Sequence, residues 1–416
     1  MNKYIALAGS FILYVTLNFS IQSCTSDIKS KNTIESSKVS NTILADTKGG
    51  AGGEIIKVTN LKSKGEGSFR NALSQDGPRI IVFEVGGVID LEKENITINK
   101  PYVTIAGQTA PSPGITLIRG GISIATHDVI VRHLKVRPGD AGEPKKSGWE
   151  VDGIATSGAG GNTYNILIDH NSVTWATDEN ISASGLRLFG PDSTSRRVTI
   201  SNNLIAEGLS NSTHSDGEHS KGTLIHDHCE NIVVTRNLYA HNVNRNPYYK
   251  TAATGIIANN LIYNPGNIAI HTYWVENEWE GYPEPPLAKI SIVGNVLVPG
   301  PDTQMGGRYN GAFVSADHAE LYVKDNQIDS GNNANISMTS GPFNEIKNPE
   351  IWDDKMEILN TDEVKKYVLS SAGARPADRD PIDRRIITSV INKEGEWLTA
   401  RKKLEGTLIL NRCIEN

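Results

Sequence analysis

The sequence predicts an all-β fold, a parallel β-solenoid, on the strength of an internal repeat and a composition rich in turn formers. A short pattern recurs seven times between residues 131 and 328: an alternating apolar strand, usually an Asn, and a second alternating pair. The 416 residues include 39 glycines, and apolar residues make up only 38%. This composition indicates many turns and argues against a helix bundle.

The N-terminal segment has the features of a secretory signal. Lys3 precedes a mostly apolar stretch over residues 4–20, and Ser23-Cys24 follow shortly after it. Polar residues and Gly interrupt the stretch, so it is a poor membrane span. We expect residues 1–23 to be a signal peptide. The Ser-Cys ending resembles the lipobox of bacterial lipoproteins, so we expect a bacterial cell-surface or outer-membrane lipoprotein, held at the membrane only through a lipid on Cys24. A plain secreted protein is the alternative.

Residues 24–50 are rich in Ser, Lys and Asn and lack a core pattern, so we expect a tether. The folded part then begins near residue 51. Strands are expected over residues 55–61, 79–85, 95–98 and 102–107. Ser68 can cap a short helix that runs to Leu73, in which Phe69 and Leu73 share one face.

The repeat predicts coils stacked in parallel. Successive repeat asparagines are separated by 32, 34, 23, 35 and 31 residues, and the shortest interval corresponds to one coil without an inserted loop. Asn tolerates the left-handed conformation of a sharp turn, and stacked amides can hydrogen-bond from coil to coil. An antiparallel β-sandwich is the alternative, but its Asn-Gly hairpin signal occurs only at Asn310-Gly311. The aligned positions are Asn171, Asn203, Asn237, Asn260, Asn295 and Asn326.

The repeat stops near residue 340, so we assign residues 51–340 to the solenoid and residues 341–416 to an extension packed on it. Thr361 can cap a helix that runs to about Leu369. Asp380-Pro381 is a second helix start, leading into residues 382–391.

Charge and cysteine content limit the class of protein. The formal net charge of −6 excludes a general nucleic-acid-binding protein. Three cysteines (Cys24, Cys229 and Cys413) cannot form a disulfide framework, although a bond between the last two stays open. We expect a monomer.

Four carboxylates fall on neighbouring coils. Glu150 and Asp152 lie two apart on a strand and therefore on one face, and Asp178 and Glu179 follow one coil later. Stacked strands are about 5 Å apart, so such a group repels itself unless a cation binds there. Hard oxygen ligands without Cys or clustered His favour Ca²⁺. Solvated surface acids are the alternative.

Three cations follow within 30 residues: Lys221, Arg245 and Lys250. Close to a bound metal, they would form a local positive cleft in an acidic protein. The alternative for each is a surface cation. Arg245 is the harder one to explain in that way, because Asn246-Pro247 follows it and proline restricts the preceding backbone.

Several stretches together resemble the pectate lyase family of right-handed parallel β-helices, in the right order and over most of residues 50–330. They are AGQTAPSPGI (106–115), HDVIVRHLKVRPGD (127–140), DGI (152–154), NILIDHNSVTWATDE (165–179) and HNVNRNP (241–247). The resemblance implies Ca²⁺-assisted cleavage of pectate, an acidic plant cell-wall polysaccharide, by β-elimination.

The resemblance also assigns the metal ligands. The calcium carboxylates of the family fall on Asp152 and Asp178, with Glu150 and Glu179 as further matches. In many relatives a further aspartate stands four positions after the one that matches Asp178. Ser182 stands there in this chain, which leaves the site one carboxylate short of those relatives.

The family's catalytic arginine falls on Arg245, in an Arg-x-Pro context, and its assisting lysine on Lys221. The second arginine that often follows the proline is absent, and Tyr248, Tyr249 and Lys250 stand there. We expect Lys250 and Tyr248 to bind substrate, Lys250 as a point charge and not as a bidentate fork. Arg245 would remove the C5 proton, and because the pKa of arginine lies above 12, an alkaline optimum is expected.

Other functions stay open. A β-helix hydrolase could use the four carboxylates as acid and base. A non-catalytic glycan-binding solenoid could stack sugars on Trp175, Tyr248 and Tyr249. A zinc site is disfavoured, because the available histidines have no zinc-motif spacing and no paired Cys. These histidines are His214, His219, His226 and His228.

Overall fold

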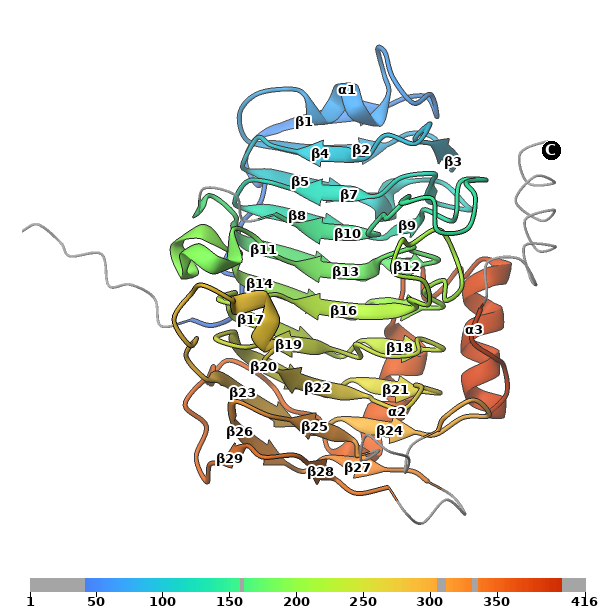
Figure 1. Ribbon diagram of the computed structural model, residues 1–416. Helices are drawn as coiled ribbons and strands as arrows, with labels where there is room; N and C mark the ends of the chain where they lie inside the picture. The colour runs from blue at the N-terminus through green and yellow to red at the C-terminus, as the bar shows by residue number, and fades with distance from the viewer. Residues whose placement is uncertain (1–41, 158–160, 305–311, 331–335, 399–416) are drawn as a thin grey trace, which may run out of the picture. The chain divides into compact units, whose positions relative to one another are not determined.

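The computed structural model describes residues 42–398 apart from 158–160, 305–311 and 331–335. Their strands form three sheets, and within each sheet every neighbouring pair is parallel (Figure 1). The chain visits the three sheets in turn, once per coil, as in a right-handed parallel β-helix. The predicted fold class is confirmed.

The first sheet consists, in stacking order, of β1 (Glu54–Val58), β2 (Arg79–Phe83), β5 (Val103–Ala106), β8 (Val129–Arg132), β11 (Tyr164–Asp169), β14 (Arg196–Ser201), β17 (Glu230–Thr235), β20 (Thr254–Ala258), β23 (Ala288–Val293), β26 (Ala319–Lys324) and β29 (Asn344–Glu345). The second consists of β4 (Ile96–Ile98), β7 (Ile122–Ile124), β10 (Ile154–Thr156), β13 (Glu179–Ala183), β16 (Lys221–Ile225), β19 (Tyr248–Lys250), β22 (Ile270–Tyr273), β25 (Val314–Ala316) and β28 (Thr339–Ser340). The third consists of β3 (Gly87–Asp90), β6 (Ile115–Ile118), β9 (Leu134–Arg137), β12 (Ser172–Thr174), β15 (Leu204–Ala206), β18 (Leu238–Ala240), β21 (Leu261–Tyr263), β24 (Val296–Val298) and β27 (Gln327–Ile328).

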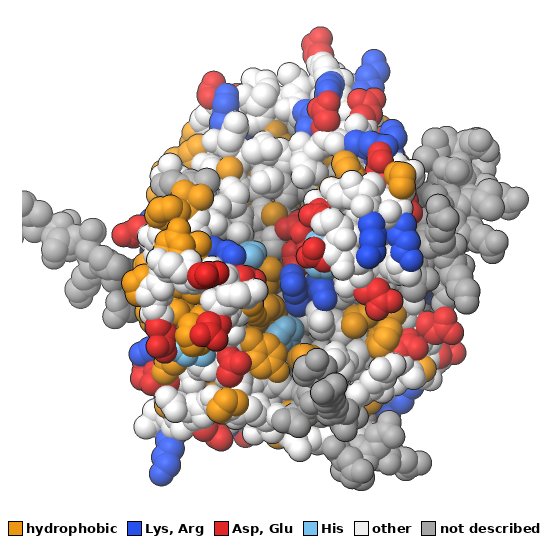
Figure 2. All heavy atoms as spheres, viewed as in Figure 1, with side chains coloured by type: hydrophobic (Ala, Val, Ile, Leu, Met, Phe, Trp, Pro, Cys, Tyr) orange, Lys and Arg blue, Asp and Glu red, His pale blue; other side chains and the backbone are white. Residues whose placement is uncertain are grey.

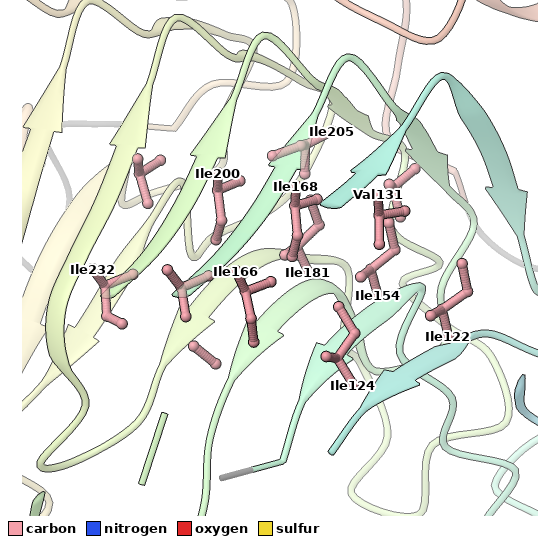
Figure 3. Close-up of a cluster of buried hydrophobic side chains, with 14 of the residues drawn as sticks. Ile122, Ile124, Val131, Ile154, Ile166, Ile168, Ile181, Ile200, Ile205 and Ile232 are labelled. Carbon is pink, nitrogen blue, oxygen red and sulfur yellow. The ribbon is translucent and has the colours of Figure 1, made fainter. Parts of the chain in front are cut away.

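Apolar side chains from all three sheets fill the interior of the solenoid (Figure 3). Equivalent positions stack from coil to coil, so that Ile122, Ile154 and Ile181 are successive register partners in the second sheet. A single coil cannot bury its inner face alone, and the stack therefore folds as one cooperative unit.

The repeat asparagines form the predicted ladder. From Asn203 to Asn326, each side-chain carbonyl accepts hydrogen bonds from both the backbone N–H and the amide of the Asn one coil earlier, as between Asn203 and Asn237 at 2.9 and 3.0 Å. Of the two predicted reasons for the Asn, the stacked amides are confirmed and the left-handed turn conformation was wrong. The residue in the left-handed conformation is the one before it, for example Asn202 (φ 53°) or Arg236 (φ 57°). Asn is selected for its amide, which pairs along the stack.

Replacing Asn237 with Ala is expected to lower the free energy of unfolding by about 3 kcal/mol, because it removes the acceptor of the buried backbone N–H and amide of Asn203 and the amide that donates to the Ile200 carbonyl. Urea unfolding followed by circular dichroism measures the change. Asn326→Ala is the matched control at the half-buried end of the ladder, where water can replace the amide, and about 1 kcal/mol is expected there. Equal losses in the two variants would contradict a buried ladder.

One short helix lies at the first coil, and two C-terminal helices cover one face of the solenoid. α1 (Phe69–Leu73) is capped by Ser68, as predicted, and lies at the first coil. α2 (Thr361–Ser371) and α3 (Pro381–Asn392) pack their apolar faces on the outer side of the third sheet (Figure 1). Asp380 caps α3 as predicted, whereas the N-cap of α2 is Asn360 and Thr361 is its first residue. No helix among the described residues is long and apolar enough to span a membrane.

The chain before β1 lies along the first sheet. The N–H groups of Ile43 and Leu44 donate to Asp353 at 2.9 and 3.1 Å, and that of Ala45 donates to Thr199 at 2.9 Å. The last part of the expected tether is therefore attached to the solenoid. The expected signal peptide, Cys24 and Cys413 lie outside the described residues, and Cys229 is a buried free thiol.

Candidate functional site

Most of the predicted site residues lie at the N-terminal ends of consecutive strands in the second sheet, whereas Lys250 is the last residue of its strand. Asp152 lies just before β10, Asp178 and Glu179 lie at the start of β13, and Lys221 is the first residue of β16. The next strand, β19, follows Arg245 and contains Tyr248 and Lys250. Because these strands pair in the order β10, β13, β16, β19, residues almost 100 positions apart in sequence meet on one face.

A cleft of about 270 Å³ lies over these strand ends. Its lining combines Asp178 and Glu179 with Arg245 and Lys250, together with side chains from the flanking loops. Figure 2 shows acidic, basic and histidine side chains gathered in one hollow of this face. The acidic protein therefore has local positive charge beside its carboxylates, as the sequence predicts.

Three carboxylates converge in the cleft. One oxygen each of Asp152, Asp178 and Glu179 lie within 4.8 Å of one another. Burial, and then the nearby charge of Asp178, raise the pKa of Asp152 to about 7. Burial also acts on Asp178, but a 2.8 Å hydrogen bond with His219 and neighbouring positive charges outweigh it and lower the pKa of Asp178. The group thus holds an excess of negative charge.

Ser182 binds Asp152 in place of a further carboxylate. Its hydroxyl donates to Asp152 Oδ2, and the N–H of Glu179 donates to Asp152 Oδ1 at 3.0 Å. Glu150 does not join the group of three. Its exposed carboxylate accepts hydrogen bonds from the N–H and the hydroxyl of Ser215.

Arg245 faces this acid group. Its Nη1 forms an ion pair with Oε1 of Glu179, whose side chain is only 5% exposed. Burial lowers the pKa of Arg245, although the charges of Asp178 and Asp152 oppose this. The ring of Tyr248 lies 5.8 Å from the guanidinium carbon. The sequence-based pairing of one arginine with the acid cluster is therefore present in the structure.

The backbone at Arg245 is held in an unusual conformation. Arg245 has φ 60°, in the left-handed region that few residues other than Gly adopt. Its carbonyl accepts a 2.6 Å hydrogen bond from Thr223 of the previous coil. This approach requires Gly222, because a Cβ there would lie 2.5 Å from the Arg245 carbonyl oxygen.

Lys221 lies next to Glu179, which is its register partner in the sheet. Burial lowers the pKa of Lys221 to about 8, although the charge of Asp178 opposes the change. Its ammonium therefore loses its proton within an accessible pH range.

Lys250 and Tyr248 have partners within the protein. The Lys250 ammonium forms an ion pair with Glu278 and lies 3.8 Å from Asp227, and its side chain is 6% exposed. The Tyr248 hydroxyl donates to the carbonyl of Tyr273 at 3.2 Å, and burial raises its pKa. Their roles in substrate binding stay predictions.

Two histidines come to the site that the sequence did not place there. His214 and His219 stack with their ring centroids 3.6 Å apart, and both have a nitrogen near Asp178. One ring nitrogen of each histidine and one carboxylate oxygen of Asp178 lie within 4.8 Å of one another, so this second group could also hold a metal ion. The expectation that the acid group has no clustered His beside it was wrong, because the loop before β16 brings both rings to Asp178.

Arg187, Asp227 and Glu278 were also missed. Arg187 belongs to η3 (Arg187–Phe189), Glu278 belongs to η5 (Glu276–Trp279), and Asp227 follows β16. They meet because the segments that follow the C-terminal ends of β13, β16 and β22 lie close together. A sequence repeat carries no signal for such loop contacts.

Comparisons with known proteins give a consistent result, although no family model matches the chain. The chain is 33% identical over 373 residues to a probable pectate lyase C of Aspergillus flavus, and the alignment covers 87% of this chain and 79% of that protein. It is 33% identical over 357 residues to a probable pectate lyase C of Emericella nidulans, covering 84% and 74%.

Solved structures show the same fold at lower identity. The major allergen from cedar pollen has a TM-score of 0.53 at 17% identity, over 79% of this chain and 90% of its own. A pectate lyase bound to a hexasaccharide has a TM-score of 0.51 at 15% identity, over 79% of this chain and 94% of its own.

Proposed function

Because the chain belongs to the pectate lyase family and is a pectate-cleaving polysaccharide lyase, we propose that it works by calcium-assisted β-elimination with Arg245 as the base. The observation that supports this most is the contact between the Arg245 guanidinium and the group formed by Asp152, Asp178 and Glu179. A base and a cation-binding group side by side are what removal of a proton next to a carboxylate requires.

The residues present fit calcium. Asp152, Asp178 and Glu179 offer only hard oxygen atoms, and the carboxyl of Asp152 is disfavoured as an anion without a cation beside it. These three residues would hold the ion. Calcium bound there supplies positive charge that neutralises the substrate carboxylate and the negative charge developing next to it.

The chain's own residues perform the proton transfer. Arg245 takes the C5 proton, and the electron pair of that C–H bond forms the C4–C5 double bond. The C4–O bond breaks, and its electron pair leaves on the oxygen of the departing fragment, which takes up a proton from water. Glu179 controls the charge of the base, because its carboxylate favours the protonated guanidinium while the two are paired. Lys221, beside Glu179, adds positive charge where the anion develops.

The rate is expected to depend on two titrations. Neutral Arg245 becomes more abundant as pH rises, so turnover should increase as the pH is raised through neutrality. Above the Lys221 pKa of about 8 its ammonium is lost and the increase should stop. Lys221→Arg keeps its positive charge at higher pH. The pH at which kcat stops rising should therefore be higher in this variant. Profiles that coincide for the two proteins, or a maximum below about pH 6, would contradict these roles.

Ultraviolet absorbance of the unsaturated product formed from polygalacturonate, with and without a chelator, tests the mechanism. We expect product that disappears with chelator and returns with added calcium. Reducing ends without absorbance would indicate hydrolysis, and binding without product would indicate a glycan-binding protein.

Secretion of the protein agrees with its substrate class and with the expected signal at residues 1–23. The bacterial lipoprotein form has no support from the two relatives described above, which are fungal. Lipidation of Cys24 and the monomeric state stay predictions.

A further inference from the structure

The cations beside Arg245 are already neutralised by the protein. Glu278 forms ion pairs with both Arg187 and Lys250 through the same carboxylate oxygen. Asp227 lies 3.1 Å from Arg187 and 3.8 Å from Lys250. Two cations therefore meet two carboxylates, and this part of the cleft has no net positive charge to offer a substrate carboxylate.

The segment that carries Glu278 is anchored in this position. Trp279, the next residue, is buried, and its indole N–H donates to Asp227 at 3.1 Å. The contact of Glu278 with Lys250 is therefore fixed by a neighbouring hydrogen bond and does not depend on one exposed side chain alone.

The other side of the same segment is acidic and aromatic. A second hollow, of about 520 Å³, is lined by Trp274 and Tyr282 together with Glu276, Glu280 and Glu284, and no Lys or Arg of the described residues lines it. Such a surface repels carboxylates and presents aromatic rings on which an uncharged sugar can pack.

We propose that Glu278 sets the specificity of the enzyme for partly methyl-esterified pectate, by making the part of the cleft beside Arg187 and Lys250 accept an uncharged unit of the polymer. This rests on the proposed function. The acidic unit that reacts lies at Asp152, Asp178 and Arg245, and a methyl-esterified unit lies toward the segment 274–284.

Glu278→Gln tests this with two substrates, polygalacturonate and a pectin in which about half of the carboxyl groups are methyl esters. Wild type is expected to have the lower KM on the half-esterified pectin. The variant frees positive charge on Arg187 and Lys250, so its KM for polygalacturonate should fall about fivefold. Its kcat, and its KM for the half-esterified pectin, should change less than about twofold. Glu345→Gln makes the same charge change on exposed β29 and should leave both KM values unchanged.

Glu276→Gln is a second variant that does not disturb the buried ion pairs, because Glu276 is exposed. It should lower the KM for polygalacturonate in the same direction, by about twofold. Two results would overturn the role of Glu278 and leave the lyase mechanism intact. One is a wild type with the lower KM on polygalacturonate, and the other is a ratio of the KM for polygalacturonate to the KM for half-esterified pectin that neither variant changes. Absence of ultraviolet-absorbing product from both substrates in wild type would instead overturn the proposed function, and the inference with it.

Discussion

Replacing Arg245 with Ala is expected to reduce the turnover of polygalacturonate on the order of a thousandfold, because it removes the group that takes the C5 proton. The fold should persist, since the Asn ladder and the apolar interior do not involve the guanidinium. The change is measured as the rate of ultraviolet-absorbing product at saturating substrate and calcium, alongside thermal unfolding by circular dichroism.

Arg384→Ala provides the control for this variant. Arg384 is exposed on α3, on the face covered by helices, so its loss should leave the rate unchanged. If Arg245→Ala kept about a tenth of the wild-type turnover, a base role for Arg245 would be excluded, because general-base catalysis contributes more than that.

Replacing Asp152 with Asn is expected to remove the stabilisation of the protein by calcium. A ligand that binds only the folded state raises its stability, and losing one of three carboxylates should weaken calcium binding on the order of 100-fold. Thermal unfolding with and without calcium measures this without any enzymatic assay. Wild type should show a higher Tm with calcium, and Asp152→Asn should show almost no shift.

The same variant has an opposite effect in calcium-free buffer. The folded state raises the pKa of Asp152 to about 7, so the ionised carboxylate costs stability increasingly from about pH 4, its ordinary pKa range, up to about pH 7. At pH 8 the calcium-free variant should therefore unfold at a higher temperature than calcium-free wild type. Asp354→Asn, at an exposed position, should change neither quantity. A calcium-dependent shift that survives in Asp152→Asn would place the ion elsewhere.

The sequence was sufficient to predict the stack, because each coil repeats the same pattern of inward apolar residues and a buried amide. Asn203 and Asn237 could be aligned from the printed residues alone, and the structure pairs them. The left-handed residue was misplaced by one position, because Asn is common both in sharp turns and in amide ladders and composition cannot separate the two uses.

The site was predictable only where it belongs to the repeat. Asp152, Asp178 and Arg245 lie at corresponding strand ends, and stacking brings them together. Arg187 and Glu278 lie in loops of unrelated length, so their meeting depends on how each loop folds over the cleft. The partner of Lys250 could not be predicted for the same reason.

Arg245 belongs to the shortest coil, with 23 residues between Asn237 and Asn260. Lengthening or shortening that coil would shift its ladder contacts with both neighbours at once, whereas the longer coils can exchange their insertions without moving a strand. Changes in the loop that carries Glu278 can therefore alter the specificity for pectin while Arg245 keeps its position. Substrate specificity and proton transfer depend on separate parts of the chain.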